Sequence, residues 1–298
     1  MPPTQQPESM RAGIAALSGY AIWGLSPIFY KLLGFASASE IVLHRAVWSV
    51  PTLLLVIWAG RNWTAVVSAF TRPRVLGLLL VSALLIAANW WTFIFAVNEG
   101  RVLEVSLGYF INPLMNVAVG LVVFREKLGP WRFAAIGLAL IGVINQIVSV
   151  GHLPLLALFL AVTFTAYGYI RKTIAVDGRV GMLVETLIIA VPSIVVLGFI
   201  QAGGEGHFTH GPVNALLLIL TGPMTVAPLL LFIIGARGLN MATIGILQFV
   251  APTLQFAIAV AYGETFTPAH AVTFGFIWAG LACFTVSMLR RSKKEVAA

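Results

Sequence analysis

Charged residues are scarce in this sequence. Asp, Glu, Lys and Arg make up 9% of its 298 residues, whereas an ordinary soluble domain carries about 25%. So few charges cannot cover a surface that faces water, which excludes a soluble globular protein. Cysteine is almost absent as well. Cys283 is the single one, so no disulfide can form within the chain.

Motifs for nucleotide-driven and metal-dependent chemistry are also missing. The sequence has no Gly-Lys-Ser/Thr phosphate loop and no His-Glu-x-x-His zinc motif. Asp177 is the only aspartate, so a pair of catalytic aspartates is excluded. We therefore expect no cofactor, no metal and no enzyme activity, and an energy source other than ATP.

Apolar residues are abundant and are gathered in long blocks. Hydrophobic residues make up 59% of the chain, and the mean hydropathy is +0.97. Blocks of about 20 residues match the length of a helix that crosses a hydrocarbon core of ~30 Å. The sequence therefore predicts an all-α membrane protein with ten transmembrane helices, near 12–33, 38–58, 75–96, 103–124, 131–150, 153–171, 180–201, 213–235, 241–261 and 270–289.

The basic residues predict the orientation of these helices. The net charge is +8, but the Lys and Arg residues are scattered over short loops and form no nucleic-acid patch. With the N-terminus in the cytoplasm, 15 of the 18 basic residues fall in cytoplasmic segments. Only Lys31 and Arg101 fall outside, and Arg45 lies within a helix. This asymmetry follows the positive-inside rule and favours an N-in/C-in topology.

The two halves of the chain resemble each other at an offset of 138 to 141 residues. Tyr30 aligns with Arg171, Phe93 with Phe232 and Pro113 with Pro252. Five helices per half is an odd number, so the second half would enter the membrane from the opposite side, as in inverted-repeat transporters. We expect a disordered cytoplasmic tail at 1–10, a first repeat at 11–150, a second repeat at 151–290 and a basic cytoplasmic tail at 291–298.

Several short stretches together resemble a known family. They run from the first predicted helix to the last: Ile22-Trp23-Gly24, Glu40-Ile41, His44-Arg45, Asn89-Trp90, Leu103-Glu104, Ser106 to Leu114, Tyr167-Gly168, Arg171-Lys172, Pro252-Thr253-Leu254, Gly263-Glu264 and Phe276-Ile277-Trp278. This set is similar to the RarD-type proteins within the EamA-type members of the drug/metabolite transporter superfamily. The resemblance implies a bacterial inner-membrane transporter with a five-plus-five helix plan, and it implies no particular substrate.

Polar residues interrupt two of the predicted helices. Glu104, Asn112 and Asn116 form one stripe on the fourth helix, and Gln248 and Gln255 share a face of the ninth. Pro113 and Pro252 would each free a carbonyl near mid-membrane, as at the helix breaks of transporters. Such prolines also occur as simple kinks, and amides also bridge helices. We expect a central substrate cavity lined by Trp23, Asn89, Tyr109, Asn112, Asn116, Tyr167, Gln248 and Gln255, with helix breaks at Pro113 and Pro252.

Five titratable residues are candidates for gating or ion coupling: Glu40, His44, Arg45, Glu104 and Glu185. Arg45 would lie about 10 Å deep, and an intramembrane charge is a functional candidate. Its possible partners on the outer side are Glu40, Glu104 and Glu264. Those of Glu185 on the inner side are Arg171, Lys172 and Arg237. The two clusters would act as alternating gates, or as static pairs that fix helix packing.

These observations predict a secondary transporter of a small organic solute, possible cargoes being metabolite-, amino-acid- or drug-like molecules. Transport would proceed by alternating access, with protons as a candidate coupling ion. The expected partners are the solute and the bilayer, and the chain would work as a monomer or a homodimer. Two alternatives stay open. One is a non-transporting scaffold or channel subunit, and the other is a membrane-embedded enzyme that modifies lipids.

Overall fold

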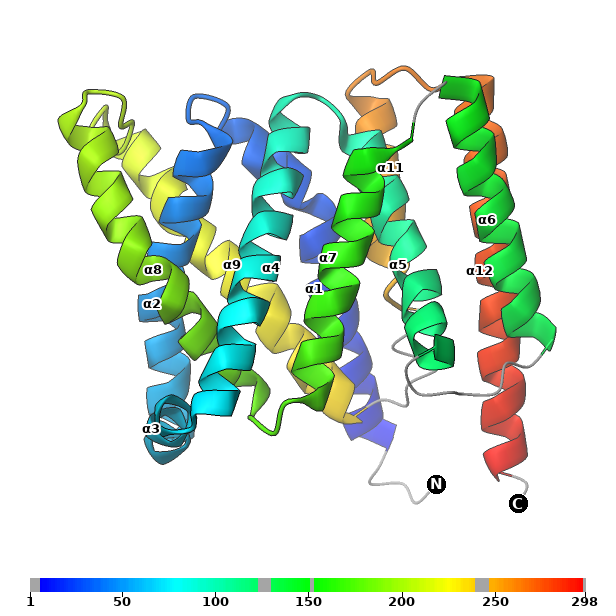
Figure 1. Ribbon diagram of the computed structural model, residues 1–298, viewed down its shortest axis with the longest axis horizontal. Coiled ribbons are helices and arrows are strands. Elements are labelled where there is room, and N and C mark those ends of the chain that lie inside the picture. Colours follow the sequence, from blue (N-terminus) through cyan, green and yellow to red (C-terminus); the bar gives the residue numbers. More distant parts are fainter. Residues whose placement is uncertain (1–5, 123–129, 151–152, 239–246, 297–298) are drawn as a thin grey trace.

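In the computed structural model every regular element of the described residues is a helix (Figure 1). The structure describes residues 6–122, 130–150, 153–238 and 247–296. The helices are α1 Gln6–Leu32, α2 Ala38–Gly60, α3 Trp63–Thr71, α4 Pro73–Asn98, α5 Val102–Val122, α6 Pro130–Val150, α7 Leu155–Thr173, α8 Gly178–Ala202, α9 Pro212–Gly238, α11 Val250–Ala261 and α12 Pro268–Val296.

Each of the ten predicted segments overlaps one of these helices, although α11 covers only the second half of the predicted segment 241–261, whose residues 241–246 lie outside the described residues. Local sequence signals explain where several of the helices start. Four helices begin on a proline: Pro73, Pro130, Pro212 and Pro268. A proline at the first helical position loses no helical hydrogen bond, and its φ angle is already helical. In α2 and α8, side chains cap the first turn. Ser37 accepts a hydrogen bond from the Glu40 N–H, and Asp177 accepts one from the Arg179 N–H.

Helix α3 was not among the predicted segments. The sequence between α2 and α4 was interpreted as a long loop, but residues 63–71 form a short helix. Val66 and Ala69 are buried against α4 and α8, whereas Val67 and Phe70 are exposed. Nine residues are too few to cross a bilayer, so a search for membrane-length blocks does not find this helix.

The outer faces of the long helices are apolar. Leu55, Phe133 and Phe199 are exposed by 66%, 73% and 74%. Five helices, namely α1, α2, α4, α8 and α9, contain a segment long and apolar enough to span a membrane, and shorter apolar segments lie in α5, α6, α7, α11 and α12. Large side chains exposed all around a bundle belong in lipid rather than water. The chain is therefore a multi-pass membrane protein.

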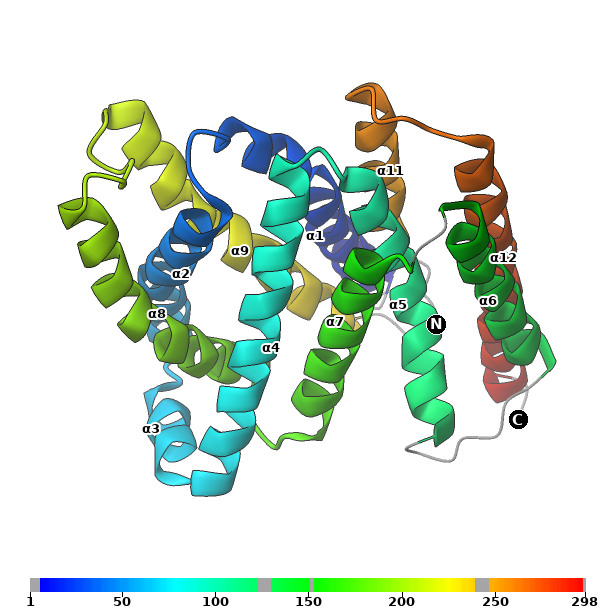
Figure 2. The ribbon, with the colours of Figure 1, turned by 45° about the horizontal axis from the view of Figure 1, so that its top comes forward.

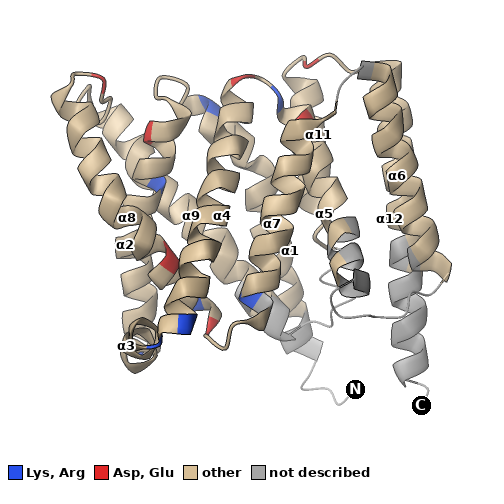
Figure 3. Ribbon diagram, in the orientation of Figure 1, with Lys and Arg blue, Asp and Glu red and all other residues tan. Residues whose placement is uncertain are grey.

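Figures 1 and 2 show a bundle in which α6 and α12 lie side by side at one edge. Helix α1 begins and α12 ends at the same end of the bundle, shown at the bottom of Figure 1. The connections from α1 to α2, α4 to α5, α8 to α9 and α11 to α12 lie at the top. In Figure 3 the described Lys and Arg residues lie mostly at the bottom, and Asp and Glu lie mostly at the top.

The helix contacts follow a regular scheme. They are described by comparing α1, α2, α4, α5 and α6, in chain order, with α7, α8, α9, α11 and α12. Helix α2 packs against its counterpart α8, α5 against α11, and α6 against α12. The contact of α1 with α9 is matched by that of α7 with α4, and the contact of α1 with α11 by that of α7 with α5. The contact of α2 with α9 is matched by that of α8 with α4.

Candidate functional site

A buried arginine lies in the upper half of the bundle. Arg45 is seven residues into α2, or about 10 Å along the helix axis, and is only 6% exposed. Its Nε donates a hydrogen bond of 2.6 Å to Thr225 Oγ1 of α9. The guanidinium lies 4.1 Å from the ring centre of Trp90 on α4 and 5.6 Å from that of Tyr30 on α1. We call Arg45, Tyr30, Trp90 and Thr225 the Arg45 cluster.

Close approach of α2 and α9 brings Thr225 within reach of Arg45. A Cβ atom on Gly222 would overlap the backbone of Trp48, so this crossing requires glycine. Ser49 reinforces it, because its hydroxyl donates to the Arg45 carbonyl at 2.7 Å and to the Gly222 carbonyl at 3.5 Å. The position of the guanidinium is therefore set by backbone packing as well as by side chains.

The carboxylates expected to pair with Arg45 are engaged elsewhere. Glu40 accepts hydrogen bonds from the backbone N–H of His207 at 2.7 Å and interacts with its ring Nδ1 at 2.8 Å. Both oxygens of Glu104 accept bonds from Arg101, at 2.7 and 2.9 Å. Glu264 accepts the N–H groups of Val102 and Leu103 at the start of α5. In the described residues no carboxylate lies within 4.0 Å of Arg45.

A buried carboxylate occupies the corresponding place in the lower half. Glu185 is seven residues into α8, and its side chain is 3% exposed. Arg171 Nη1 of α7 lies 3.6 Å from Glu185 Oε1, so one of the expected partners of Glu185 is present. Lys172 and Arg237, the other two, lie outside the described side chains. Ser82 of α4 donates a short hydrogen bond to Oε1, and Tyr167 of α7 donates one of 3.4 Å to Oε2. We call Glu185, Arg171, Ser82 and Tyr167 the Glu185 cluster.

Glycine also makes room for the Glu185 cluster. A Cβ atom on Gly181 would overlap the guanidinium of Arg171. Arg171 Nη2 donates to the Gly178 carbonyl at 2.9 Å, so the side chain lies along the first turn of α8. Its Nη1, oriented toward Glu185, makes no hydrogen bond with the described atoms and interacts with the carboxylate through charge.

Aromatic rings connect the two clusters through the interior. Neighbouring ring centres lie 5.7 to 6.2 Å apart, within the range of favourable aromatic contact. The series runs from the Arg45 cluster to the Glu185 cluster through Tyr30, Phe93, Tyr109, Phe164 and Tyr167. The two clusters are thus connected by a path of contacting aromatic rings, which belong to α1, α4, α5 and α7.

Several residues expected to line a cavity are buried near this path and bonded across helices. Asn89 donates to the Leu160 carbonyl and to Thr163, and accepts a bond from Tyr109 at 3.2 Å. Asn112 accepts a bond from Thr165 at 3.2 Å. These contacts join α4 and α5 to α7. The amides therefore bridge helices in this conformation, which was the alternative interpretation of them.

A second group of the expected cavity residues joins α1 to α11. Gln255 Nε2 donates to the carbonyl of Trp23 at 3.3 Å, while its Oε1 is buried without a donor among the described atoms. The Trp23 ring packs against Tyr20 and Phe232, with ring centres 5.8 and 6.1 Å away. An unused acceptor beside an aromatic cluster leaves Gln255 able to bind a further donor.

The predicted helix break in the second half lies slightly earlier than Pro252. Gln248 and Phe249 form a turn, and Pro252 is in the first turn of α11, where it disturbs no helical bond. The Pro252 carbonyl accepts a hydrogen bond of 2.8 Å from Ser106 of α5. Gln248 is partly buried. The side chains of Pro113 and Asn116 lie outside the described residues.

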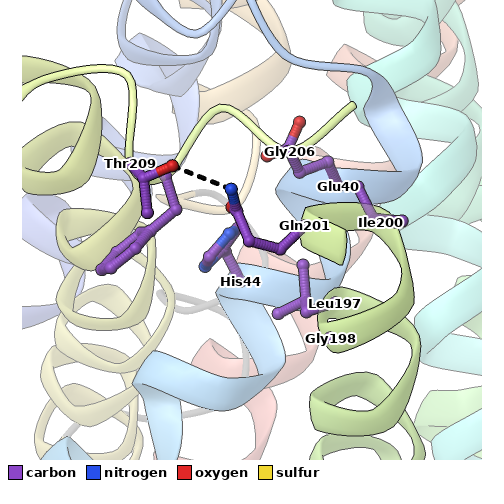
Figure 4. Close-up of a pocket in the computed structure, with 9 residues that line it drawn as sticks. Glu40, His44, Leu197, Gly198, Ile200, Gln201, Gly206 and Thr209 are labelled. Carbon is purple, nitrogen blue, oxygen red and sulfur yellow. Dashed lines mark hydrogen bonds between the residues drawn. The ribbon is translucent and has the colours of Figure 1, made fainter. Parts of the chain in front are cut away.

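Two pockets open at the upper end. The smaller, of ≈ 200 Å³, lies between α2, the end of α8 and the following loop, and Glu40, His44 and Gln201 line it (Figure 4). Phe208 of that loop stacks on His44 with ring centres 5.2 Å apart. The larger, of ≈ 760 Å³, is lined by Lys31, Glu104, Glu264 and other residues of the loops around α5, α6 and α12. The amides and the two charged clusters form no part of either lining.

Two ion pairs join a residue just before a helix to one in its first turn: Arg101 with Glu104 at α5, and Asp177 with Arg179 at α8. Hydrogen bonds to Glu104 raise the pKa of the Arg101 guanidinium above its ordinary value. Hydrogen bonds from Arg179 lower the pKa of the Asp177 carboxyl, and the backbone N–H groups at the start of α8 add to this. Asp177 thus caps α8 in its ionised form, in the first turn that leads to Glu185.

Comparison with known proteins agrees with this architecture. The model of the EamA-like transporter family matches residues 10–145. An "Uncharacterized transporter" of Vibrio cholerae is 40% identical, over 97% of this chain and 96% of that protein. "Protein RarD" of Escherichia coli K12 is 39% identical, over 94% and 97%. A crystal structure with 18% identity aligns with a TM-score of 0.63 over 93% of this chain and 98% of the other, which shows a shared fold.

Where the name of one of these relatives states an activity, that activity is transport. Their similarity extends over nearly the whole chain, from α1 to α12, and all of those compared here are bacterial. Full-length identity of about 39% together with the match to the family model is decisive. The chain belongs to the EamA family of membrane transporters and is a homologue of the RarD proteins.

Proposed function

We propose that this chain is a secondary transporter that moves a small organic solute across the bacterial inner membrane. Transport would proceed by alternating access between two inverted five-helix halves, residues 11–150 and 151–290, with both termini in the cytoplasm. The tails at 1–10 and 291–298 lie outside the halves. The bottom of Figure 1 is then the cytoplasmic side, which agrees with its basic residues.

The observation that carries this proposal is the scheme of helix contacts. Exchanging the first five membrane helices for the last five reproduces the main contacts between the two groups, including α1–α9 for α7–α4 and α2–α9 for α8–α4. An inverted repeat predicts this result, because a pseudo-two-fold axis in the membrane plane exchanges the halves. Rocking of one half against the other would then convert a state open to one side of the membrane into a state open to the other side.

The two charged clusters support the same proposal. Arg45 and Glu185 each lie seven residues into corresponding helices that start at opposite ends of the bundle (Figure 1). A charge buried at equal depth on each side of a central region is suited to control access from that side. A buried cation in one half of the bundle and a buried anion in the other also provide two sites at which a coupling ion could act.

Among the candidate titratable residues, we propose Glu185 as the coupling group if protons drive transport. Its carboxylate has three polar neighbours on two helices, and one of these neighbours is a cation. Glu104 is held by Arg101 near the surface, and His44 accepts a bond from the Trp48 indole and stacks on Phe208. Glu185 is the one that lies at the end of the interior aromatic path.

Reconstitution tests this function. Purified protein in proteoliposomes preloaded with a mixed pool of amino acids, organic acids and small aromatic drugs should accumulate labelled members of that pool by counterflow. An imposed pH gradient should drive uptake in the wild type but not in Glu185→Gln, which keeps the shape and loses the charge. Absence of counterflow for every member of the pool would refute a transport function.

A labelling experiment tests the orientation. A Cys283→Ser background removes the one native cysteine. Ser68→Cys in α3 and Thr209→Cys in the loop before α9 then lie at opposite ends of the bundle. A membrane-impermeant maleimide added to intact spheroplasts should label position 209 and spare position 68. The reverse pattern would invert the proposed topology.

A further inference from the structure

The Arg45 cluster contains a buried cation for which no acid of the described residues is available. The guanidinium donates a hydrogen bond from Nε to Thr225 and also interacts with the side chain of Tyr30, and neither of these partners is an acid. The upper-half carboxylates Glu40, Glu104 and Glu264 are satisfied by His207, by Arg101 and by backbone N–H groups. The contrast with Glu185, which has Arg171, is direct.

An arginine in this position remains charged although no described carboxylate neutralises it. The guanidinium is not deprotonated in proteins, and it carries five N–H donors in a planar fork. Thr225 occupies the Nε donor, while the faces lie toward the rings of Trp90 and Tyr30. The contact with the Trp90 ring restrains the plane of the fork. The guanidinium is therefore held in a defined orientation with no carboxylate beside it among the described residues.

A charge in the membrane interior is retained when it serves a function, because removing its water is costly. A planar fork with two parallel N–H groups matches a carboxylate, which accepts both bonds at once. The apolar rings that lead away from the cluster, Tyr30 and then Phe93, suit the carbon skeleton of an organic acid. A hydrated inorganic anion would gain nothing from them.

We propose that Arg45 binds the carboxylate group of the transported solute, which is therefore an organic acid. Trp90 and Tyr30 hold the guanidinium in its plane, and Thr225 fixes its rotation. This inference rests on the proposed transport function and adds the chemical class of the cargo. In the upper half the solute itself would supply the carboxylate partner of Arg45, so this ion pair would form only when solute is bound.

One consequence does not depend on knowing the cargo. If the cation is present for a ligand, the solute-free protein carries an uncompensated buried charge, and an apolar residue of similar volume removes that cost. Arg45→Met should therefore raise the melting temperature of the ligand-free protein in detergent or nanodiscs. Arg74→Gln, an exposed arginine at the start of α4, is the matched control and should leave it unchanged.

Binding is then measured with defined probes on full-length protein in nanodiscs. At least one of four carboxylates should shift the melting temperature and quench tryptophan fluorescence saturably. The four are acetate, benzoate, glutamate and phenylalanine. Acetamide and benzamide, the neutral counterparts of the first two, and inorganic phosphate should do neither. Arg45→Met should weaken the responding carboxylate by about tenfold to a hundredfold, as expected for loss of a charge-assisted bond. Arg45→Lys, which keeps the charge without the fork, should fall between.

The outcomes separate this inference from the transport function. A lower melting temperature in Arg45→Met, amides that bind as well as acids, a response to phosphate equal to that of the carboxylates, or no response to any carboxylate would each overturn the assignment. Counterflow of a neutral solute that Arg45→Met leaves unchanged would retain the transporter and remove the carboxylate. Carboxylate binding through Arg45 without any counterflow would retain the site and refute transport.

Discussion

Arg45 and Glu185 each lie seven residues into a helix, yet the Arg45 cluster and the Glu185 cluster balance charge in different ways. Glu185 is neutralised by Arg171 and bonded by Ser82 and Tyr167. Arg45 is held by a hydroxyl and two aromatic rings, with no carboxylate partner among the described residues. The charge of the lower cluster is therefore balanced by a described ion pair, whereas that of the upper cluster is not. Two buried charges in one bundle can thus differ in whether the protein itself supplies the counter-charge.

The largest expected effect comes from breaking the pair in the lower cluster. Arg171→Gln leaves Glu185 buried without its cation, and loss of one partner of a buried pair costs about 3–5 kcal/mol. The melting temperature should fall sharply, in contrast to the rise expected for Arg45→Met. The double variant Arg171→Gln/Glu185→Gln should recover most of the loss. Equal shifts in Arg171→Gln and Arg45→Met would erase the difference between the clusters.

A smaller effect is expected from filling the space that Gly181 leaves. In Gly181→Ala the new methyl group displaces the Arg171 guanidinium, and overpacking of this kind costs about 1–3 kcal/mol. Gly198→Ala in the same helix has open space around it and serves as the control. In a double-mutant cycle Gly181→Ala should cost little once Arg171 is Gln. Additive losses would show that the glycine is needed for another reason.

The hydroxyl that orients Arg45 gives the next test. Thr225→Val keeps the volume and removes the acceptor of the Nε bond, so the guanidinium loses its fixed rotation. Hydrogen bonds to charged groups contribute about 1.5–3 kcal/mol at most, and the Trp90 ring retains part of the restraint. We expect a modest loss of stability and a weaker carboxylate response in the nanodisc assay. Thr221→Val, on the same helix and without an Arg45 contact, controls for the loss of a threonine hydroxyl.

The smallest effect concerns the cap that precedes Glu185. Because the folded-state pKa of Asp177 is lowered by Arg179, the ionised carboxyl stabilises the fold above the pKa of the unfolded chain, about 3.9. That contribution is lost as the pH falls through the lower folded-state pKa. The melting temperature of the wild type should exceed that of Asp177→Asn slightly at pH 7. The gap should close on acidification, and a gap that widens would contradict the assigned sign. Solvent exposure of this pair keeps the effect small.

The sequence predicts the elements of this fold better than their contacts. Apolar blocks predicted the positions of ten of the eleven helices in the described residues, of which five contain a segment long enough to span a membrane. It missed α3, whose nine residues carry no such signal. The family resemblance was confirmed by the relatives of full length. The assignment of a cavity to Asn112, Gln255 and the other amides stays a prediction.

Within the candidate site, sequence reasoning identified the charges but only part of their surroundings. Arg45 and Glu185 were selected as charges within apolar blocks, and Arg171 was among the proposed partners of Glu185. Ser82, Thr225 and Trp90 were not identified. Trp90 follows Asn89 in a stretch that carries the resemblance, and Tyr30 aligns with Arg171 in the repeat. These two features of the sequence could have suggested Trp90 and Tyr30 as neighbours of the charges, whereas no feature of the sequence distinguishes Ser82 and Thr225.

The sequence by itself determined that this protein is a helical membrane protein, where ten of its helices lie, and that Arg45 and Glu185 are charges within apolar segments. These properties depend on hydrophobicity and length, which are local. Only the tertiary structure decided that Glu185 has a cation and that Arg45 meets Thr225 and Trp90. These partners are 14 to 180 residues apart in the chain, and glycines at Gly181 and Gly222 set how closely their helices approach. Whether a buried charge has a counter-charge therefore depends on which helices pack closely together, and no pattern along a single helix shows that.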